Sequence, residues 1–283
     1  MINLRQCLRG GVLAVALAVT GPVAYPTLAE SRDARTEAPA DRIVITNMFD
    51  NVRTDTRLTA RWGFAALISR GGSELLFDTG GDGSVLLANM AALGVDPQGI
   101  DAVMISHAHS DHIGGLDRLL DENDRVRILL PGGVPEQARR RLSVRGVEYR
   151  VLDAPVEIFP GMHSTGTLGK DVREQALVLE TGDGLVILTG CAHPGIVEIV
   201  KRARAIDPEA AVALVMGGMH LREASNRQID TVISGLKALG VRKVAPSHCT
   251  GDRAIERFRL AYGAEFVRAG AGTTLSFGLR PKN

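Results

Sequence analysis

Three histidines and one aspartate fall within the six residues His107-Ala108-His109-Ser110-Asp111-His112. They directly follow an apolar segment, Asp101 to Ser106, that predicts a buried strand, so the cluster lies on the loop that leaves this strand. Imidazoles two residues apart on an extended backbone project to the same side and can bind one metal ion. Asp111 and His112 then add an oxygen and a nitrogen for a second ion. This cluster constrains the chain to a fold that brings further ligands to the same loop edge.

Composition excludes some classes of partner. The 283 residues are 45% hydrophobic, which is enough for a large core. Lysine and arginine total 33 against 32 aspartates and glutamates, so net charge gives no reason to expect nucleic acid or an anionic membrane as a partner. A small-molecule substrate is expected instead. With one Trp, three Tyr and seven Phe, the sequence shows no aromatic platform for a ring-bearing ligand.

The N-terminus has the pattern of a secretory signal peptide over residues 1–29. Arg5 and Arg9 precede an apolar run from Gly11 to Ala24, which ends near the small-residue site Thr27-Leu28-Ala29. Residues 30–40 form a polar lead, and residues 41–283 are predicted to be a single domain. We therefore expect a periplasmic or secreted protein with no membrane attachment after cleavage. The alternative is an uncleaved membrane anchor, for which the apolar run is short.

Short β-rich segments alternate with helical ones from residue 42 onward, which predicts a layered α/β fold. Each half of the chain begins with β-rich segments and continues with strand-loop-helix units. Strands are predicted at Arg42–Phe49, Trp62–Ser69, Glu74–Phe77, Asp101–Ser106, Val126–Leu130, Val147–Leu152, Gln175–Glu180, Leu185–Thr189, Ala211–Met216 and Val241–Ala245. Helices are predicted at Ser84–Leu93, Gly114–Leu120, Pro135–Leu142, Pro194–Ala205 and Arg227–Leu239.

Six of the seven histidines lie in loops that directly follow a predicted strand; His163 is the exception. Loops at the carboxyl ends of strands meet at one edge of a layered fold, where clefts form. The histidines of this set are therefore expected to converge on one site: His107, His109, His112, His193, His220 and His248.

The histidine motif, extended to Ile113-Gly114-Gly115 and preceded by Leu76-Phe77-Asp78-Thr79-Gly80, resembles the signature of the metallo-β-lactamase superfamily. Gly190-Cys191-Ala192-His193-Pro194-Gly195 and Ser247-His248-Cys249-Thr250-Gly251 are similar to the subgroup of dihydropterin-methyl-ribofuranosylaminobenzene-phosphate synthase-like proteins. The resemblance implies a four-layer αββα sandwich with a one- or two-metal site between its sheets. It does not select a reaction, because the superfamily contains many.

The resemblance also implies a ligand set. His107 and His109 would bind the first metal with a third histidine, for which His193 is preferred and His163 is the competitor. Asp111, His112 and His248 would bind the second metal.

One position departs from the family pattern. Cys191 stands where many members have an aspartate that bridges the two metals. Its thiolate could replace the carboxylate, since thiolate suits zinc, or Cys191 could be a buried structural cysteine. Cys191 and Cys249 could also form a disulfide in an oxidising compartment.

Residues around the ligands have expected supporting roles. Asp78, at the end of its strand, is expected to accept a hydrogen bond from a ligand histidine and so fix its tautomer. His220 and Cys249 either line the substrate pocket or are structural. The polar stretch Asn51–Arg61 contains three arginines that either meet an anionic group or belong to a solvated loop: Arg53, Arg57 and Arg61.

These features predict a metal-dependent hydrolase of a small-molecule ester, lactone, phosphate or related bond. A divalent ion lowers the pKa of bound water towards ~7 and so supplies hydroxide, and Asp111 would orient this nucleophile or accept its proton. Zinc is the expected metal, in one or two copies, with iron or manganese also compatible. The alternatives are a non-catalytic sensory protein of the same fold and an iron-dependent redox enzyme. The substrate and the oligomeric state are left open.

Overall fold

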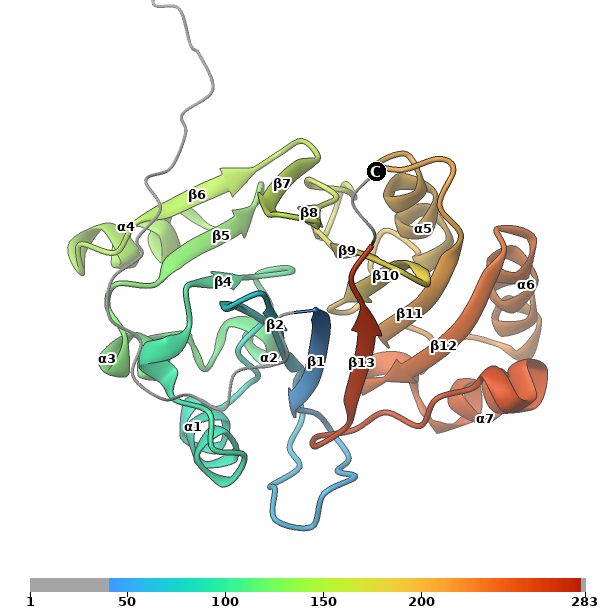
Figure 1. Cartoon of the computed structure of the whole chain (residues 1–283), viewed down its shortest axis with the longest axis horizontal. Helices are drawn as coiled ribbons and strands as arrows, with labels where there is room; N and C mark the ends of the chain where they lie inside the picture. The colour runs from blue at the N-terminus through green and yellow to red at the C-terminus, as the bar shows by residue number, and fades with distance from the viewer. Residues whose placement is uncertain (1–40, 281–283) are drawn as a thin grey trace, which may run out of the picture. The chain divides into compact units, whose positions relative to one another are not determined.

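The computed structural model describes residues 41–280, which belong to one compact unit. A seven-stranded sheet is built mainly from the first half of this segment (Figure 1). β3, β4, β5 and β6 run parallel, whereas β13, β1, β2 and β3 pair antiparallel. In spatial order its strands are β13 (Thr274–Gly278), β1 (Arg42–Phe49), β2 (Ala65–Arg70), β3 (Ser73–Phe77), β4 (Ala102–Met104), β5 (Arg127–Pro131) and β6 (Tyr149–Leu152).

A second sheet of six strands comes from the second half of the described segment. β10, β11 and β12 are parallel, and β7 to β10 pair antiparallel. The spatial order is β12 (Val241–Ser247), β11 (Val212–Gly218), β10 (Gly184–Thr189), β9 (Leu177–Thr181), β8 (Met162–Ser164) and β7 (Val156–Phe159).

Apolar side chains from both sheets pack against one another between them. In β1, for example, burial alternates so that Ile43 and Ile45 face this shared core, as the period of two in a strand requires. The outer faces of the sheets are covered by helices (Figure 1). α1 (Gly83–Ala92), α3 (Leu116–Glu122) and α4 (Glu136–Val144) pack on the first sheet, and α5 (Ile196–Arg204), α6 (Asn226–Ala238) and α7 (Asp252–Tyr262) pack on the second. The four-layer αββα sandwich is confirmed.

Two predicted elements differ in ways that matter for the site, whereas the other boundary differences are of one or two residues. The strand predicted from Trp62 begins only at Ala65, because Gly63 has a φ of 143°, outside the extended region, and leaves Trp62 on a loop. The helix predicted from Gly114 is preceded by a separate short helix, α2 (Ser110–Ile113), which contains half of the histidine motif.

Besides α2 and three short 3-10 helices, four elements of the described segment were not predicted: β7, β8, β13 and α7. The three strands have three to five residues each, too few to show a clear period. α7 did carry a signal, since its buried residues Ala254, Phe258 and Tyr262 recur every four positions.

The predicted signal peptide (residues 1–29) and polar lead (30–40) lie outside the described residues. Between residues 41 and 280, no helix has the length and apolar character needed to cross a membrane.

Candidate metal centre

The first cluster of ligand atoms combines loops from both sheets. His107 and His109 follow β4 of the first sheet, and His193 follows β10 of the second. One ligand atom from each of the three lies within 4.8 Å of the others. His107 is fully buried, and its Nε2 is 3.1 Å from His109 Nδ1. Here we call His107, His109 and His193 the first group.

A second cluster adjoins the first. Asp111 and His112 from α2, Cys191 after β10 and His248 after β12 place ligand atoms within 4.8 Å of one another. His112 Nε2 lies 3.1 Å from His248 Nε2 and 3.2 Å from Cys191 Sγ, and His248 Nε2 lies 3.2 Å from Asp111 Oδ2. We call these four residues the second group. All six residues predicted as metal ligands therefore occur in the two groups, and Cys191 joins them.

Cys191 lies at the junction of the groups, because its sulfur also lies within 4.8 Å of ligand atoms of His193 and His220. The alternative of a disulfide is not realised, since Cys191 and Cys249 are both free and buried. The Cys249 thiol instead contacts the Cys191 carbonyl oxygen at 3.6 Å. The hydrogen bond with Cys249 and burial raise the pKa of the Cys191 thiol.

The hydrogen bonds around the imidazoles fix the nitrogen on which each proton resides. His112 Nδ1 is 2.7 Å from Asp78 Oδ2, and a carboxylate can only accept, so Nδ1 carries the proton. His107 Nδ1 lies 2.9 Å from Ser106 Oγ, whose own proton is donated to Asp78 at 2.7 Å. The predicted role of Asp78 as a hydrogen-bond acceptor is confirmed for His112, and through Ser106 it extends to His107.

The same arrangement recurs at His193 and His248. His193 Nδ1 donates to Glu174 Oε2 at 3.0 Å, and His248 Nδ1 to Asn51 Oδ1 at 3.1 Å. Nε2 is therefore left without a proton in these two residues, as in His107 and His112. Two unprotonated nitrogens about 3 Å apart have no favourable interaction with each other. The spacing instead matches the roughly 3.3 Å expected between two ligands of a tetrahedral ion at ~2.0 Å.

Burial keeps the central imidazoles neutral. Burial and the nearby His112 lower the pKa of His107 to about 3, and burial together with His248 lowers that of His112 to about 3. Both side chains therefore offer lone pairs rather than positive charge at neutral pH. Burial raises the pKa of Asp78 to about 7, while the nearby His107 and the hydrogen bonds from Ser106 favour its ionised form.

Glu174 is a supporting residue that the sequence did not predict. Its fully buried carboxylate accepts hydrogen bonds from the backbone N–H groups of Cys191, Ala192 and His193, at 2.8 to 2.9 Å, besides the imidazole of His193. Burial alone would raise its pKa, but these donors lower it to about 2. Glu174 thus holds the loop that carries members of both groups. A single acidic residue 17 to 19 positions before its partners gives no sequence signal.

Asn51 was also missed as a supporting residue. Its amide donates to the His248 carbonyl at 2.9 Å, and its Oδ1 accepts from His248 Nδ1 and from Gly63 N. The loop after β1 therefore positions a ligand from the opposite sheet.

Asp111 is half-buried beside its histidine neighbours. Burial would raise the pKa of this carboxyl, but the neighbouring His248 and His112 outweigh it and hold the pKa below its usual range. The Trp62 indole N–H also donates to Asp111 Oδ2 at 2.9 Å. Asp111 is therefore an ionised acceptor at neutral pH.

Trp62 is an aromatic side chain that lies beside the second group. The only tryptophan in the chain is 44% exposed, and its ring lies 5.0 Å from the His248 ring. The guanidinium carbon of Arg222 lies 5.0 Å from the Trp62 ring centre.

Backbone strain is concentrated in these loops. Within residues 41–280, the non-glycine residues with positive φ are Asp78, Ala192, His220 and His248, at 49° to 62°. Each follows a strand and belongs to the site or contacts it. Such conformations cost of order 1–3 kcal/mol each and occur mainly where function requires them.

His163, the competitor for the third-histidine position, lies away from the groups. It belongs to β8, and its Nε2 is 3.0 Å from Glu180 Oε1.

The three arginines of the loop Asn51–Arg61 each contact a nearby carbonyl oxygen or carboxylate. Arg53 donates to the Leu58 carbonyl oxygen, Arg57 pairs with Asp55, and Arg61 pairs with Asp82. They correspond to the solvated-loop alternative rather than to an anion site.

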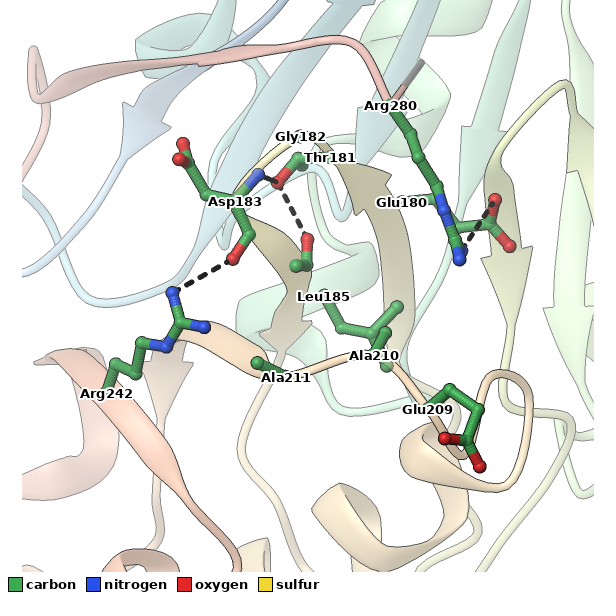
Figure 2. A pocket seen from close by; sticks show the side chains of 11 residues that line it. Glu180, Thr181, Gly182, Asp183, Leu185, Glu209, Ala210, Ala211, Arg242 and Arg280 are labelled. Carbon is green, nitrogen blue, oxygen red and sulfur yellow. Dashed lines mark hydrogen bonds and ion pairs between the residues drawn. The ribbon is translucent and has the colours of Figure 1, made fainter. Parts of the chain in front are cut away.

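A surface depression of about 410 Å³ lies at the other end of β10, around the turn Thr181–Gly184 (Figure 2). Its charged lining is largely internally paired: Arg242 donates to the Asp183 carbonyl at 3.3 Å, and Arg280 is 3.9 Å from Glu180. It contains no member of the two groups.

Residues 59–203, about half of the chain, match the family model described as the Metallo-beta-lactamase superfamily. The chain belongs to the metallo-β-lactamase superfamily. Its members bind divalent metals and are mostly metal-dependent hydrolases. The family resemblance inferred from the motifs is thereby confirmed.

Two further comparisons cover most of the chain. A 7,8-dihydropterin-6-methyl-4-(beta-D-ribofuranosyl)-aminobenzene-5'-phosphate synthase from Methanocaldococcus jannaschii is 29% identical over 248 residues, which span 72% of this chain and 84% of that protein. The solved structure of Tm1679, a metal-dependent hydrolase of the beta-lactamase superfamily, has a TM-score of 0.69 at 27% identity, with 83% of this chain and 99% of that chain covered.

Some relatives act on RNA. A Ribonuclease Z from Mycobacterium sp. (strain KMS) is 30% identical over 105 residues, which span 34% of this chain and 36% of that protein. The expectation that nucleic acid is not a partner of this chain therefore stays a prediction.

Proposed function

We propose that this chain is a metal-dependent hydrolase that acts on a small-molecule substrate with one or two zinc ions. The observation that carries the proposal is the set of four imidazoles whose Nδ1 protons are bound by acceptors and whose ligand atoms lie within 4.8 Å of the other ligand atoms of their group. Three nitrogens in the first group, and nitrogen, sulfur and oxygen in the second, suit zinc; iron or manganese would also be accepted.

When bound, a divalent metal supplies a nucleophilic hydroxide at neutral pH and polarises the bond to be cleaved. Side chains of the protein would position the water and transfer protons. Asp111, ionised and held by Trp62 at 2.9 Å, can accept a proton from the attacking water. His220, which is exposed and whose ring lies 4.4 Å from that of His193, can donate a proton to the leaving group. We also propose export to the periplasm or medium, on the pattern of residues 1–29.

The test is a turnover panel of ester, lactone, β-lactam, phosphodiester and sulfate substrates, run with and without a chelator. The proposal expects hydrolysis of at least one class, loss of turnover on chelation and recovery when zinc is added back. Turnover that survives chelation would contradict it.

The remaining outcomes separate the alternatives. Metal binding without turnover of any class would favour a non-catalytic binding protein. Iron rather than zinc in the purified protein, with redox activity, would favour the redox enzyme. A product formed by transfer to an acceptor other than water would favour a synthase, as the name of the M. jannaschii relative implies.

A further inference from the structure

Among the described residues, Arg222 has no paired acid, unlike Arg61 and Arg257 nearby. Within residues 41–280, no hydrogen bond or ion pair reaches its exposed guanidinium, which lies over Trp62. By contrast, Arg61 pairs with Asp82, Arg253 donates to the Ala224 carbonyl oxygen, and Arg257 pairs with Asp230 at 2.6 Å. An exposed guanidinium fixed against a ring keeps its five donors available for a ligand.

The backbone of Arg222 is fixed relative to the metal groups. A Cβ added to Gly251 would lie 2.7 Å from Arg222 Cα, so the segment after β11 packs directly on the loop after β12 that carries His248. Met219 N also donates to Thr250 Oγ1 at 3.0 Å. Arg222 therefore has a defined position beside the second group rather than on a freely moving loop.

Trp62 lies between the Arg222 guanidinium and His248 of the second group. The Trp62 ring lies 5.0 Å from Arg222 Cζ and 5.0 Å from the His248 ring. The distance from Arg222 Cζ to the His248 ring therefore does not exceed the sum of these two distances. Trp62 comes from the loop before β2 and Arg222 from the loop after β11, so the pair spans the two halves of the fold. A small substrate at the metal groups is within reach of both side chains.

We propose that Arg222, supported by the face of Trp62, is an anion-binding subsite that recognises a phosphate or carboxylate group carried by the substrate beside its scissile bond. A planar guanidinium binds either oxyanion through two parallel N–H···O hydrogen bonds. Trp62 positions the guanidinium and provides a flat surface for the adjoining part of the substrate. The proposal rests on the proposed hydrolase function for the location of the scissile bond.

The single tryptophan makes binding directly measurable. Inorganic phosphate and acetate are titrated separately into the metal-loaded protein at constant ionic strength, and the fluorescence of Trp62 is followed. We expect a saturable change for at least one of the two, and the tighter anion identifies the group. Arg222→Gln should raise the dissociation constant of the protein for that anion about 10–100-fold, the usual range for a charge-assisted contact. Arg222→Lys should be intermediate, because it keeps the charge and loses the planar fork.

Arg227→Gln is the matched control, since it removes the same charge from an exposed position at the start of α6. It should bind the anion as the wild type does. Binding by Arg222→Gln within twofold of the wild type, an equal loss in Arg227→Gln, or no saturable change in the wild type would each overturn the proposal.

Kinetics provide the second readout. For an anionic substrate from the panel, Arg222→Gln should raise KM with little change in kcat, whereas KM for a neutral substrate should stay within twofold. A fall in kcat for both substrates would assign Arg222 a structural role instead and contradict the subsite. If no substrate is hydrolysed, the proposed function fails, and the fluorescence titration still decides whether Arg222 binds an anion.

Discussion

Four of the five histidines in the two groups depend on the residues that accept their Nδ1 protons. Asp78 and Ser106 hold two of them, and Asn51 and Glu174 hold the others. Of these acceptors, Glu174 has the largest set of donors, three backbone N–H groups and one imidazole, and it is fully buried. Its effect on the metal groups should therefore exceed that of an ordinary surface carboxylate.

Glu174→Gln should lower the affinity of the first group for zinc about 10–100-fold, because the amide that replaces one oxygen cannot accept from His193 or its backbone. Zinc affinity is measured by competition with a chromophoric chelator. Glu180→Gln, at a partly exposed carboxylate far from the groups, should leave the affinity unchanged. Wild-type affinity in a folded Glu174→Gln variant would show that this carboxylate does not position the ligands.

The family resemblance and the strand-end histidines predicted the six candidate ligands, because both are patterns that can be read from the sequence alone. Most of the residues that support the candidate ligands could not be recognised from the sequence. Glu174 and Asn51 act through contacts with segments 17 to 197 residues away, and neither belongs to a motif. Asp78 was predicted only because it ends a strand within a family motif.

At the level of elements, the ends of β10 and β11 must approach closely for the ligand loops to meet. Gly218 makes this possible, since a Cβ there would lie 2.3 Å from the Gly190 carbonyl oxygen and 2.7 Å from Cys249 Sγ. The sequence predicted these strands within one or two residues, because their apolar runs are long and continuous. It missed β7, β8 and β13, whose stability comes from pairing with distant strands rather than from local pattern.

Gly218→Ala should destabilise the protein by about 1–3 kcal/mol, the usual cost of overpacking, and should also reduce metal binding. Gly278→Ala, in β13, introduces the same methyl group where nothing lies within 4 Å, and should change neither property. The free energy of unfolding is obtained from denaturant titration of both variants. Equal stability of the two variants would contradict the close approach of β10 and β11.

For the whole molecule, the two metal groups join the halves of the sandwich. His107, His109, Asp111 and His112 belong to the segment that follows β4 of the first sheet and includes α2, whereas Cys191, His193 and His248 follow strands of the second. Each group thus contains ligands from both halves. The αββα arrangement could be predicted from the alternation of elements and the family motif. The sequence also preferred His193 over His163, and the fold places His193 with His107 and His109 while His163 lies in β8.

The central claim is that the two groups bind divalent metal, with two ions per chain when both groups are filled, and metal content per chain tests it most directly. After loading with zinc and removal of excess, the wild type should contain two zinc ions per chain by mass spectrometric elemental analysis. His109→Ala and His248→Ala should each lose one ion from a different group, and His163→Ala should retain both. A wild type without bound metal, or two ions retained in both ligand variants, would contradict the account.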